Sequence, residues 1–280
     1  MPGPKDLDPA SSPRALIGSE LRHARERNGF SQAQLGEPLF LSGSFIGQLE
    51  AGTRRMQHEY AVQFDVMLRT DGFFTRNCDT SAKSRYPEHF EEAAEAEAVT
   101  TAIRNYNPLL IPGLLQTPAY AAELFRTYRP MVSDAEVEEL VAIRMERARL
   151  LDDPTKPLLM TVIDEAALRR PVGGPAAMSE TLRHVADLMR RRRIIAQVLP
   201  FTAGAHAGLG GALKLMEFPD GPPLCFLEGL DTGKLVDDPA TVARHALTFT
   251  LLQTTALSPA HSLDLIETVA QDYEHEKARS

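Results

Sequence analysis

The sequence predicts a mainly helical protein, with a bundle of short helices at the N-terminus and an α+β C-terminal domain of helices around a small sheet. Two observations give this fold class. Apolar residues follow a 3.6-residue period from Arg14 to about Phe74, as they do in amphipathic helices. After Pro154, four short apolar runs are bounded by Pro, Gly or Asp, a pattern typical of strands.

Capping residues define the N-terminal helices. Asn28-Gly29 is suited to end the first helix in a left-handed cap. Ser31 and Ser42 are suited to cap the next two, the second of which stops at Gly52. A last amphipathic stretch runs over 60–68. The expected buried faces of the first three helices contain Leu16, Ile17, Leu21, Ala24, Ala33, Leu35, Phe45, Ile46 and Leu49.

The C-terminal part begins with helix signals and continues with mixed ones. A helix is expected over 94–105, and Thr117-Pro118 opens another that runs to about Tyr128. Ser133 and Glu136 form a capping box that opens a helix to Leu151. Three later helices are expected over about 176–190, 239–256 and 259–277. The predicted strands are Leu158–Ile163, Ile194–Leu199, Ala212–Phe218 and Leu224–Glu228.

These elements predict four segments along the chain. Residues 1–13 are polar and proline-rich, which predicts a disordered tail. Residues 14–76 form the helical bundle, and the charged, small-residue-rich stretch 77–93 is the expected linker. Residues 94–280 form the α+β domain.

Charge is distributed unevenly between these segments. The chain has 30 Lys and Arg against 38 Asp and Glu, a net charge of −8. Residues 1–76 carry nine of each sign, so all the excess negative charge lies in residues 77–280. A neutral front and an acidic rear indicate different roles for the two parts.

Composition excludes several classes of protein. No apolar run approaches the roughly 18 residues that a membrane span needs, and the N-terminus has no apolar signal-peptide core. Two cysteines, Cys78 and Cys225, are too few for a disulfide framework or a zinc site. A cytoplasmic protein without a membrane partner, metal or cofactor is therefore expected.

The arrangement of the second and third helices suits DNA binding. A helix-turn-helix motif joins two helices by a tight turn and places the second in the major groove. Ser31–Gly36 begins the first helix of such a pair, and residues 43–50 form the second. Gly43, Ser44, Gly47 and Gln48 would then face the groove.

Residues 14–76 resemble the XRE family of Cro/lambda-repressor-like helix-turn-helix regulators. The resemblance implies that Gln32 binds a phosphate, that Ser44 and Gln48 reach base edges, and that Arg54 and Arg55 hold backbone phosphates. Glutamine can pair with adenine through two hydrogen bonds, whereas serine discriminates little. The residues that carry it are Leu21-Arg22, Arg25, Asn28-Gly29-Phe30-Ser31-Gln32, Ser44-Phe45-Ile46 and Leu49-Glu50-Ala51-Gly52-Thr53-Arg54-Arg55.

The sequence departs from the family pattern in three ways, and the departures predict structural features. Phe40 stands where the turn usually has glycine. Pro38 should shorten or kink the first helix of the pair. Gly43 and Gly47 offer little side chain for base readout, which predicts limited sequence specificity or a close backbone approach to DNA.

Residues 95–270 resemble the uncharacterised C-terminal domain of a large set of actinobacterial regulators, some of them antitoxin-like. The resemblance implies a transcriptional regulator with a small protein partner encoded nearby, and it implies no chemistry for the domain. Its main stretches are Tyr106–Thr117, Arg144-Met-Glu-Arg147, Asp164–Gly174, Gln197–Phe201, Gly204-Ala-His206 and Ala256-Leu-Ser258.

Several groups of residues in the C-terminal part can be interpreted in two ways. Glu165, Arg169 and Arg170, with His206, form a candidate partner- or ligand-binding group, although a structural ion pair is the favoured interpretation. The glycine-rich stretch 204–211 matches no phosphate-binding fingerprint and is expected to be a turn. The arginine run 190–193 is expected to be a solvated helix end.

The sequence therefore predicts a DNA-binding transcriptional regulator, expected to act as a homodimer on double-stranded DNA. Its C-terminal domain would receive a small protein partner or a small-molecule ligand. The alternative is an antitoxin-like protein-interaction module with weak or secondary DNA binding. An enzyme has the least support, because no nucleophile, acid–base pair or metal-ligand spacing stands out.

Overall fold

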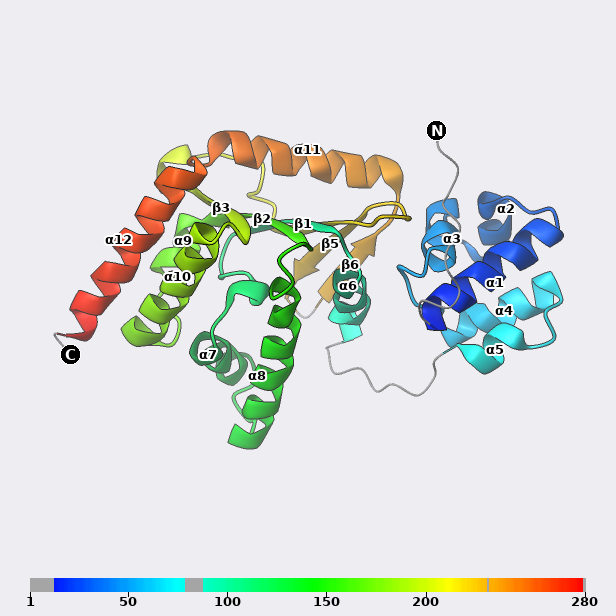
Figure 1. Cartoon of the computed structure of the whole chain (residues 1–280), viewed down its shortest axis with the longest axis horizontal. Helices are drawn as coiled ribbons and strands as arrows, with labels where there is room; N and C mark the ends of the chain where they lie inside the picture. Colours follow the sequence, from blue (N-terminus) through cyan, green and yellow to red (C-terminus); the bar gives the residue numbers. More distant parts are fainter. Residues whose placement is uncertain (1–12, 79–87, 231, 279–280) are drawn as a thin grey trace. The chain divides into compact units, whose positions relative to one another are not determined.

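The structure, a computed structural model, describes residues 13–78, 88–230 and 232–278. Its fold is mainly helical with a six-stranded mixed sheet in the C-terminal part, which confirms the predicted fold class. The chain divides into two compact units (Figure 1). The first contains Met1–Thr101, Leu215–Phe226 and Leu230–Arg244; the second contains Ala102–Lys214, Leu227–Gly229 and His245–Ser280.

Five α-helices and one 3-10 helix at the start of the first unit form a bundle around one apolar cluster. In chain order the bundle contains α1 (Pro13–Arg27), α2 (Gln32–Gly36), the 3-10 helix η1 (Glu37–Leu39), α3 (Gly43–Glu50), α4 (His58–Leu68) and α5 (Phe73–Asn77). The cluster includes Leu21, Leu35, Ile46 and Phe64, all completely buried. The 3.6-residue period predicted these contacts, because it places apolar residues on one face of each helix, but Leu16 and Ala33, which were expected on the buried faces, are exposed.

The turn between α2 and α3 follows from Pro38. Because proline cannot continue an α-helix, α2 ends at Gly36 and a 3-10 turn follows, as predicted. Phe40 then adopts a left-handed backbone with φ 56° and is fully exposed. The conformation explains why a glycine suits this position better than a phenylalanine.

Asp65 holds the turn between α4 and α5. Its carboxylate accepts hydrogen bonds from the Thr70 and Thr75 hydroxyls and from the backbone N–H groups of Phe74 and Thr75. Burial alone would raise the pKa of Asp65, but these four bonds stabilise the anion and together lower the pKa below its ordinary value.

Asp65 should make the stability of the bundle depend on acid pH. Because the pKa is lower in the folded state, its contribution is complete above the ordinary value of about 3.8 and is lost as pH falls through the lowered pKa. We expect melting curves of the wild type and Asp65→Asn to differ most near neutral pH and to converge below about pH 4. A difference that is constant from pH 7 to pH 2.5 would contradict this role. The exposed neighbour Asp71→Asn is the control.

The rest of the first unit contains α6 (Glu88–Ala98), half of β4 (Ala212–Glu217), part of β5 (Leu224–Gly229), β6 (Thr232–Val236) and the start of α11 (Pro239–Thr255). Phe90, Ala93 and Ala94 of α6 pack against Phe218 and Phe226. Residues 88–93 of the expected linker are helical, because apolar side chains of α6 pack against these strands. The predicted tail 1–13 lies, except for Pro13, outside the described residues.

Three parallel strands form the centre of the second unit: β1 (Ala102–Asn107), β2 (Leu158–Asp164) and β3 (Ile194–Leu199). Ile103 pairs with Leu159, and Leu159 with Ile194, so apolar residues line one face in register. The order of the whole sheet is β3-β2-β1-β4-β5-β6. Strand β1 and the short β6 were missed by the sequence analysis, which extended the preceding helix to residue 105.

Helices cover this sheet in the second unit. They are α7 (Pro118–Tyr128), α8 (Asp134–Ala148), α9 (Glu165–Arg169), α10 (Gly174–Arg190), α11 (Pro239–Thr255) and α12 (Pro259–Lys277), with 3-10 turns η2 (Gly113–Leu115), η3 (Arg149–Leu151) and η4 (Phe201–Ala203). Helices α10 and α12 lie side by side (Figure 1). The capping box at Ser133 is confirmed, whereas the Thr117 hydroxyl bonds with Thr181 and caps no backbone N–H.

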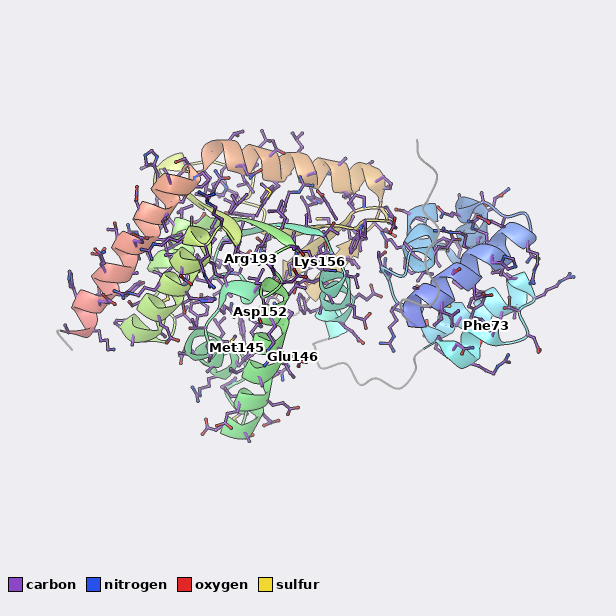
Figure 2. The ribbon with its side chains drawn as sticks, viewed as in Figure 1. Phe73, Met145, Glu146, Asp152, Lys156 and Arg193 are labelled. Atoms are coloured by element: carbon purple, nitrogen blue, oxygen red, sulfur yellow. The ribbon has the colours of Figure 1, made fainter. Side chains whose placement is uncertain are left out.

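The arginine run 190–193 is held by internal partners. Arg193 donates to the carbonyl oxygens of Leu151, Pro157 and Lys156 at 2.6, 2.9 and 3.1 Å, and so ties the start of β3 to the segment before β2 (Figure 2). Arg190 pairs with Glu267 at 2.5 Å. The run therefore has a structural role in addition to the solvated face that was expected.

Candidate nucleic-acid interface

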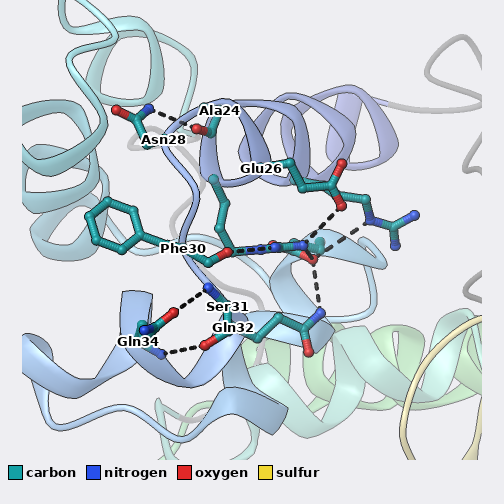
Figure 3. A network of polar contacts seen from close by, with 10 residues as sticks. Ala24, Glu26, Asn28, Phe30, Ser31, Gln32 and Gln34 are labelled. Atoms are coloured by element: carbon teal, nitrogen blue, oxygen red, sulfur yellow. Dashed lines mark hydrogen bonds and ion pairs between the residues drawn. The ribbon is translucent and has the colours of Figure 1, made fainter.

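Helices α2 and α3 form the predicted helix-turn-helix pair. The Ser31 hydroxyl accepts from the N–H of Gln34, whose side chain accepts in return from the Ser31 N–H, so a capping box starts α2 (Figure 3). The Ser42 hydroxyl accepts from the N–H of Phe45 and starts α3. Both caps confirm the sequence prediction and fix where the exposed start of α3 lies relative to α2.

A buried carboxylate, Glu50, joins the last turn of α3 to α1 and α2. Arg25 donates to its two oxygens from Nε at 2.5 Å and from Nη2 at 3.1 Å. Gln32 donates to Oε2 at 2.9 Å (Figure 3), and Arg22 Nε lies 3.6 Å from the same oxygen. The hydrogen bonds that Arg25 donates to Glu50 hold the pKa of Arg25 above its ordinary value. The network sets the angle of α3.

The network changes the interpretation of Gln32, which was expected to bind a DNA phosphate. Its amide nitrogen is already used by Glu50, and its side chain lies against Gly47, where a Cβ would come 3.3 Å from Gln32 Oε1. In this arrangement one N–H of the Gln32 amide helps to position α3, and the expected contact of Gln32 with a DNA phosphate stays a prediction. The pattern alone did not reveal Glu50 as the organising residue, although Leu49-Glu50 belongs to the quoted motif.

The exposed surface of α3 is small. Gly43, Ser44 and Gly47 are partly exposed, as expected for residues that face a groove. Gln48 is completely buried, and neither its oxygen nor its nitrogen has a hydrogen-bond partner within the described part of the chain. Gln48 would have to become exposed to reach base edges, and this expected role stays a prediction.

Arg54 and Arg55 follow α3 and are bound to acidic side chains. Arg54 donates to Glu92 at 2.6 Å, and its guanidinium lies 4.1 Å from the centre of the Phe45 ring. Arg55 pairs with Glu91 at 2.9 Å and with Glu95 at 3.8 Å. The two arginines thus lie shortly after α3 with acidic side chains as partners, and their expected contacts with DNA phosphates stay a prediction.

The second predicted group lies at the carboxyl end of β2 in the second unit. Arg169 pairs with Glu165 at 2.6 Å, and the other oxygen of Glu165 accepts from the N–H of Phe201 at 2.9 Å. Arg170 is exposed. These contacts favour the structural interpretation of the group, because one carboxylate oxygen pairs within α9 and the other joins α9 to η4, just after β3.

His206 lies apart from Glu165, beside two residues that the sequence analysis did not select. Its Nε2 is 3.9 Å from Asp164 Oδ2, and its ring meets that of Tyr106 edge to face. Tyr106 donates to Asp164 at 3.2 Å, and burial together with that carboxylate raises the pKa of the phenol. Asp164 could have been suspected from its position directly after a predicted strand, where ligand-binding groups gather in parallel sheets.

Two family models match the chain, and their matched ranges do not overlap. A family model described as a helix-turn-helix domain matches residues 16–72, which include the Ser31 and Ser42 caps and the Glu50 network. A second model, a domain of unknown function called DUF5753, matches residues 90–268, more than half of the chain.

The chain belongs to the DUF5753 family.

In this DUF5753 protein the N-terminal module is an XRE-like helix-turn-helix, and together the two matches support a DNA-binding regulator. No curated protein and no solved structure matches the chain. None of the described helices is both long and apolar enough to span a membrane. Among the described residues, no group of three or more His, Cys, Asp or Glu is placed to hold a metal ion.

Proposed function

We propose that the protein is a transcriptional regulator that inserts α3 into the major groove of its operator as a homodimer. The observation that supports it is the position of Arg54 and Arg55 directly after a Ser42-capped α3, with Gly43, Ser44 and Gly47 partly exposed on that helix. Arginine side chains beside a recognition helix bind backbone phosphates and fix the register of the protein on the duplex. Half-sites about 34–36 Å apart are expected for such a dimer.

The C-terminal domain is proposed to receive the signal, as a small protein partner or a small-molecule ligand. Its acidic charge favours a basic partner and disfavours non-specific DNA. Binding of the partner would change operator affinity only if the partner prefers one arrangement of the protein over another.

A second candidate function is an antitoxin-like protein-interaction module in which DNA binding is weak. The burial of Gln48 favours it, since a residue expected to read bases is covered. A fluorescence-anisotropy titration distinguishes the two functions. It compares the affinity for DNA from the region upstream of the gene with the affinity for a scrambled duplex. Preference for the upstream DNA supports the regulator; no preference, together with a stable complex with the neighbouring small protein, supports the interaction module.

The double variant Arg54→Ala and Arg55→Ala should weaken binding to every duplex. Each lost phosphate contact removes about 0.9 from the slope of log affinity against log salt, so the slope should become shallower by about two. Titrations at several salt concentrations measure it. Arg126→Ala with Arg129→Ala removes the same charge from exposed positions of the second unit and should leave the slope unchanged. A slope that the Arg54 and Arg55 changes do not alter would contradict the assignment.

A further inference from the structure

Helix α6 has one apolar face and one acidic face. Phe90, Ala93, Ala94 and Ala96 are buried against β4 and β5 of the first unit. The acidic face, Glu91, Glu92 and Glu95, is partly exposed, with 19–30% of each side chain accessible. Because the apolar face packs against the strands, the helix holds the three carboxylates in a fixed position.

The acidic face binds the segment that follows the recognition helix. Three short contacts are made: Glu92 accepts from Arg54 at 2.6 Å and from Gln57 at 2.7 Å, and Glu91 accepts from Arg55 at 2.9 Å. A carboxylate and a phosphate oxygen are interchangeable partners for a guanidinium, because both accept its paired N–H donors. Glu91 and Glu92 therefore occupy the arginine donors that DNA phosphates would use.

Two further contacts extend the cover to both ends of α3. Asp237, just after β6, accepts from the Ser42 hydroxyl at 3.0 Å and lies 3.7 Å from Arg54 Nη1. A Cβ placed on Gly221, in the β4–β5 turn, would come 3.3 Å from side-chain atoms of both Ala51 and Thr53. Thr53 is only 6% exposed and Gln48 is completely buried. The start of α3, its end and the arginines beyond it all face C-terminal segments.

We propose that α6 and Asp237 form a built-in competitor for DNA, so that the first unit as described is an autoinhibited state of the helix-turn-helix. The inference rests on the proposed DNA-binding function and adds its regulation. DNA phosphates and the carboxylates Glu91, Glu92, Glu95 and Asp237 repel one another and need the same arginines. The protein must therefore release the acidic face before α3 enters a groove.

Two features of the inhibited arrangement favour its release. Its ion pairs are partly exposed, and pairs of this kind are individually weak and screened by salt. The Gln48 amide and Arg54 Nε are buried without hydrogen-bond partners within the described part of the chain, which disfavours this arrangement. An adenine edge offers the glutamine amide both of its missing bonds.

The test is the triple variant Glu91→Gln, Glu92→Gln and Glu95→Gln in the full-length protein. Its affinity for both the upstream and the scrambled duplex should rise about 3- to 30-fold, since apparent affinity is reduced by the fraction of molecules that is inhibited. Glu138→Gln, Glu139→Gln and Asp272→Asn neutralise three exposed carboxylates of the second unit and give the same net charge. Asp237→Asn should act in the same direction as the triple variant, with a smaller effect.

Hydrogen exchange without DNA provides a second readout. Amides of residues 41–57 should exchange faster in the triple variant than in the wild type or in the charge-matched control. Equal affinity and equal exchange in the wild type and the triple variant would overturn the inference. An equal rise in affinity in the control would also overturn it, because it would assign the effect to overall charge.

A different set of results would exclude the proposed function. If no duplex binds to the wild type or to the triple variant at any salt concentration, the regulator is excluded, together with the role of α6 as a competitor for DNA. If the wild type binds DNA with a salt-dependent affinity that the triple variant does not improve, the regulator stands and only the autoinhibition is excluded.

Discussion

Replacing Glu50 with alanine is expected to lower the free energy of unfolding of the N-terminal bundle by about 3–5 kcal/mol. The side chain of Glu50 is completely buried, and those of Arg22 and Arg25 are only 14% and 11% exposed. Removing the carboxylate leaves two guanidinium groups together with little access to water, and an uncompensated buried charge is costly. Because the helices of the bundle are short, its other contacts offset little of this loss.

The change should also abolish DNA binding, because Glu50 joins α3 to Arg25 of α1 and Gln32 of α2. Chemical denaturation followed by circular dichroism measures the loss of stability. Glu59→Ala, an exposed glutamate of α4, is the matched control and should change the stability by less than about 1 kcal/mol. A Glu50→Ala protein as stable as the control would show that the network is dispensable.

The second large effect is expected at Gly208 in the second unit. A Cβ on Gly208 would overlap the ring of Tyr106, coming 2.9 Å from its Cδ1, and the ring is 1% exposed and so has no room to move. Gly208 also donates its backbone N–H to His206 Nδ1 at 3.2 Å. Gly208→Ala should therefore destabilise the second unit by about 1–3 kcal/mol, the usual cost of overpacking.

Gly210 provides a control two residues away in the same loop. A Cβ there would meet open space, so Gly210→Ala should leave the melting temperature nearly unchanged. Thermal melting of the two variants compares the two positions directly. Equal melting temperatures would mean that the loop moves away from Tyr106 at little cost, and that the Tyr106, Asp164 and His206 cluster is not a fixed part of the core.

Local signals predicted most of the elements. The caps at Ser31, Ser42 and Ser258 depend on one side chain and a backbone N–H three residues on, so their sequence neighbours suffice to identify them. Strand β3 was predicted to the residue, because it is a short, mostly apolar run that ends at a proline. Helix α12 likewise spans the predicted range 259–277.

Strand β1 shows where local signals fail. Its sequence, Ala-Ile-Arg-Asn-Tyr-Asn, is polar and follows a run of helix-forming residues, so periodicity extended the helix through it. In the structure Ile103 and Tyr106 are buried, and Asn105 is 5% exposed. Pairing with β2 decides this conformation, and the partner lies more than 50 residues away in the chain.

The sequence by itself determined the helix-turn-helix module, the cations beside it and the acidic character of the part that follows. Each of these depends on residue type and on spacing along the chain. Only the tertiary structure decided that Gln32 belongs to Glu50, that Gln48 is covered, and that Glu91 and Glu92 hold Arg55 and Arg54. The physical reason is that the sequence around an arginine is the same whether its partner is a phosphate or a carboxylate. Folding decides the partner, because it brings the carboxylates close to the arginines.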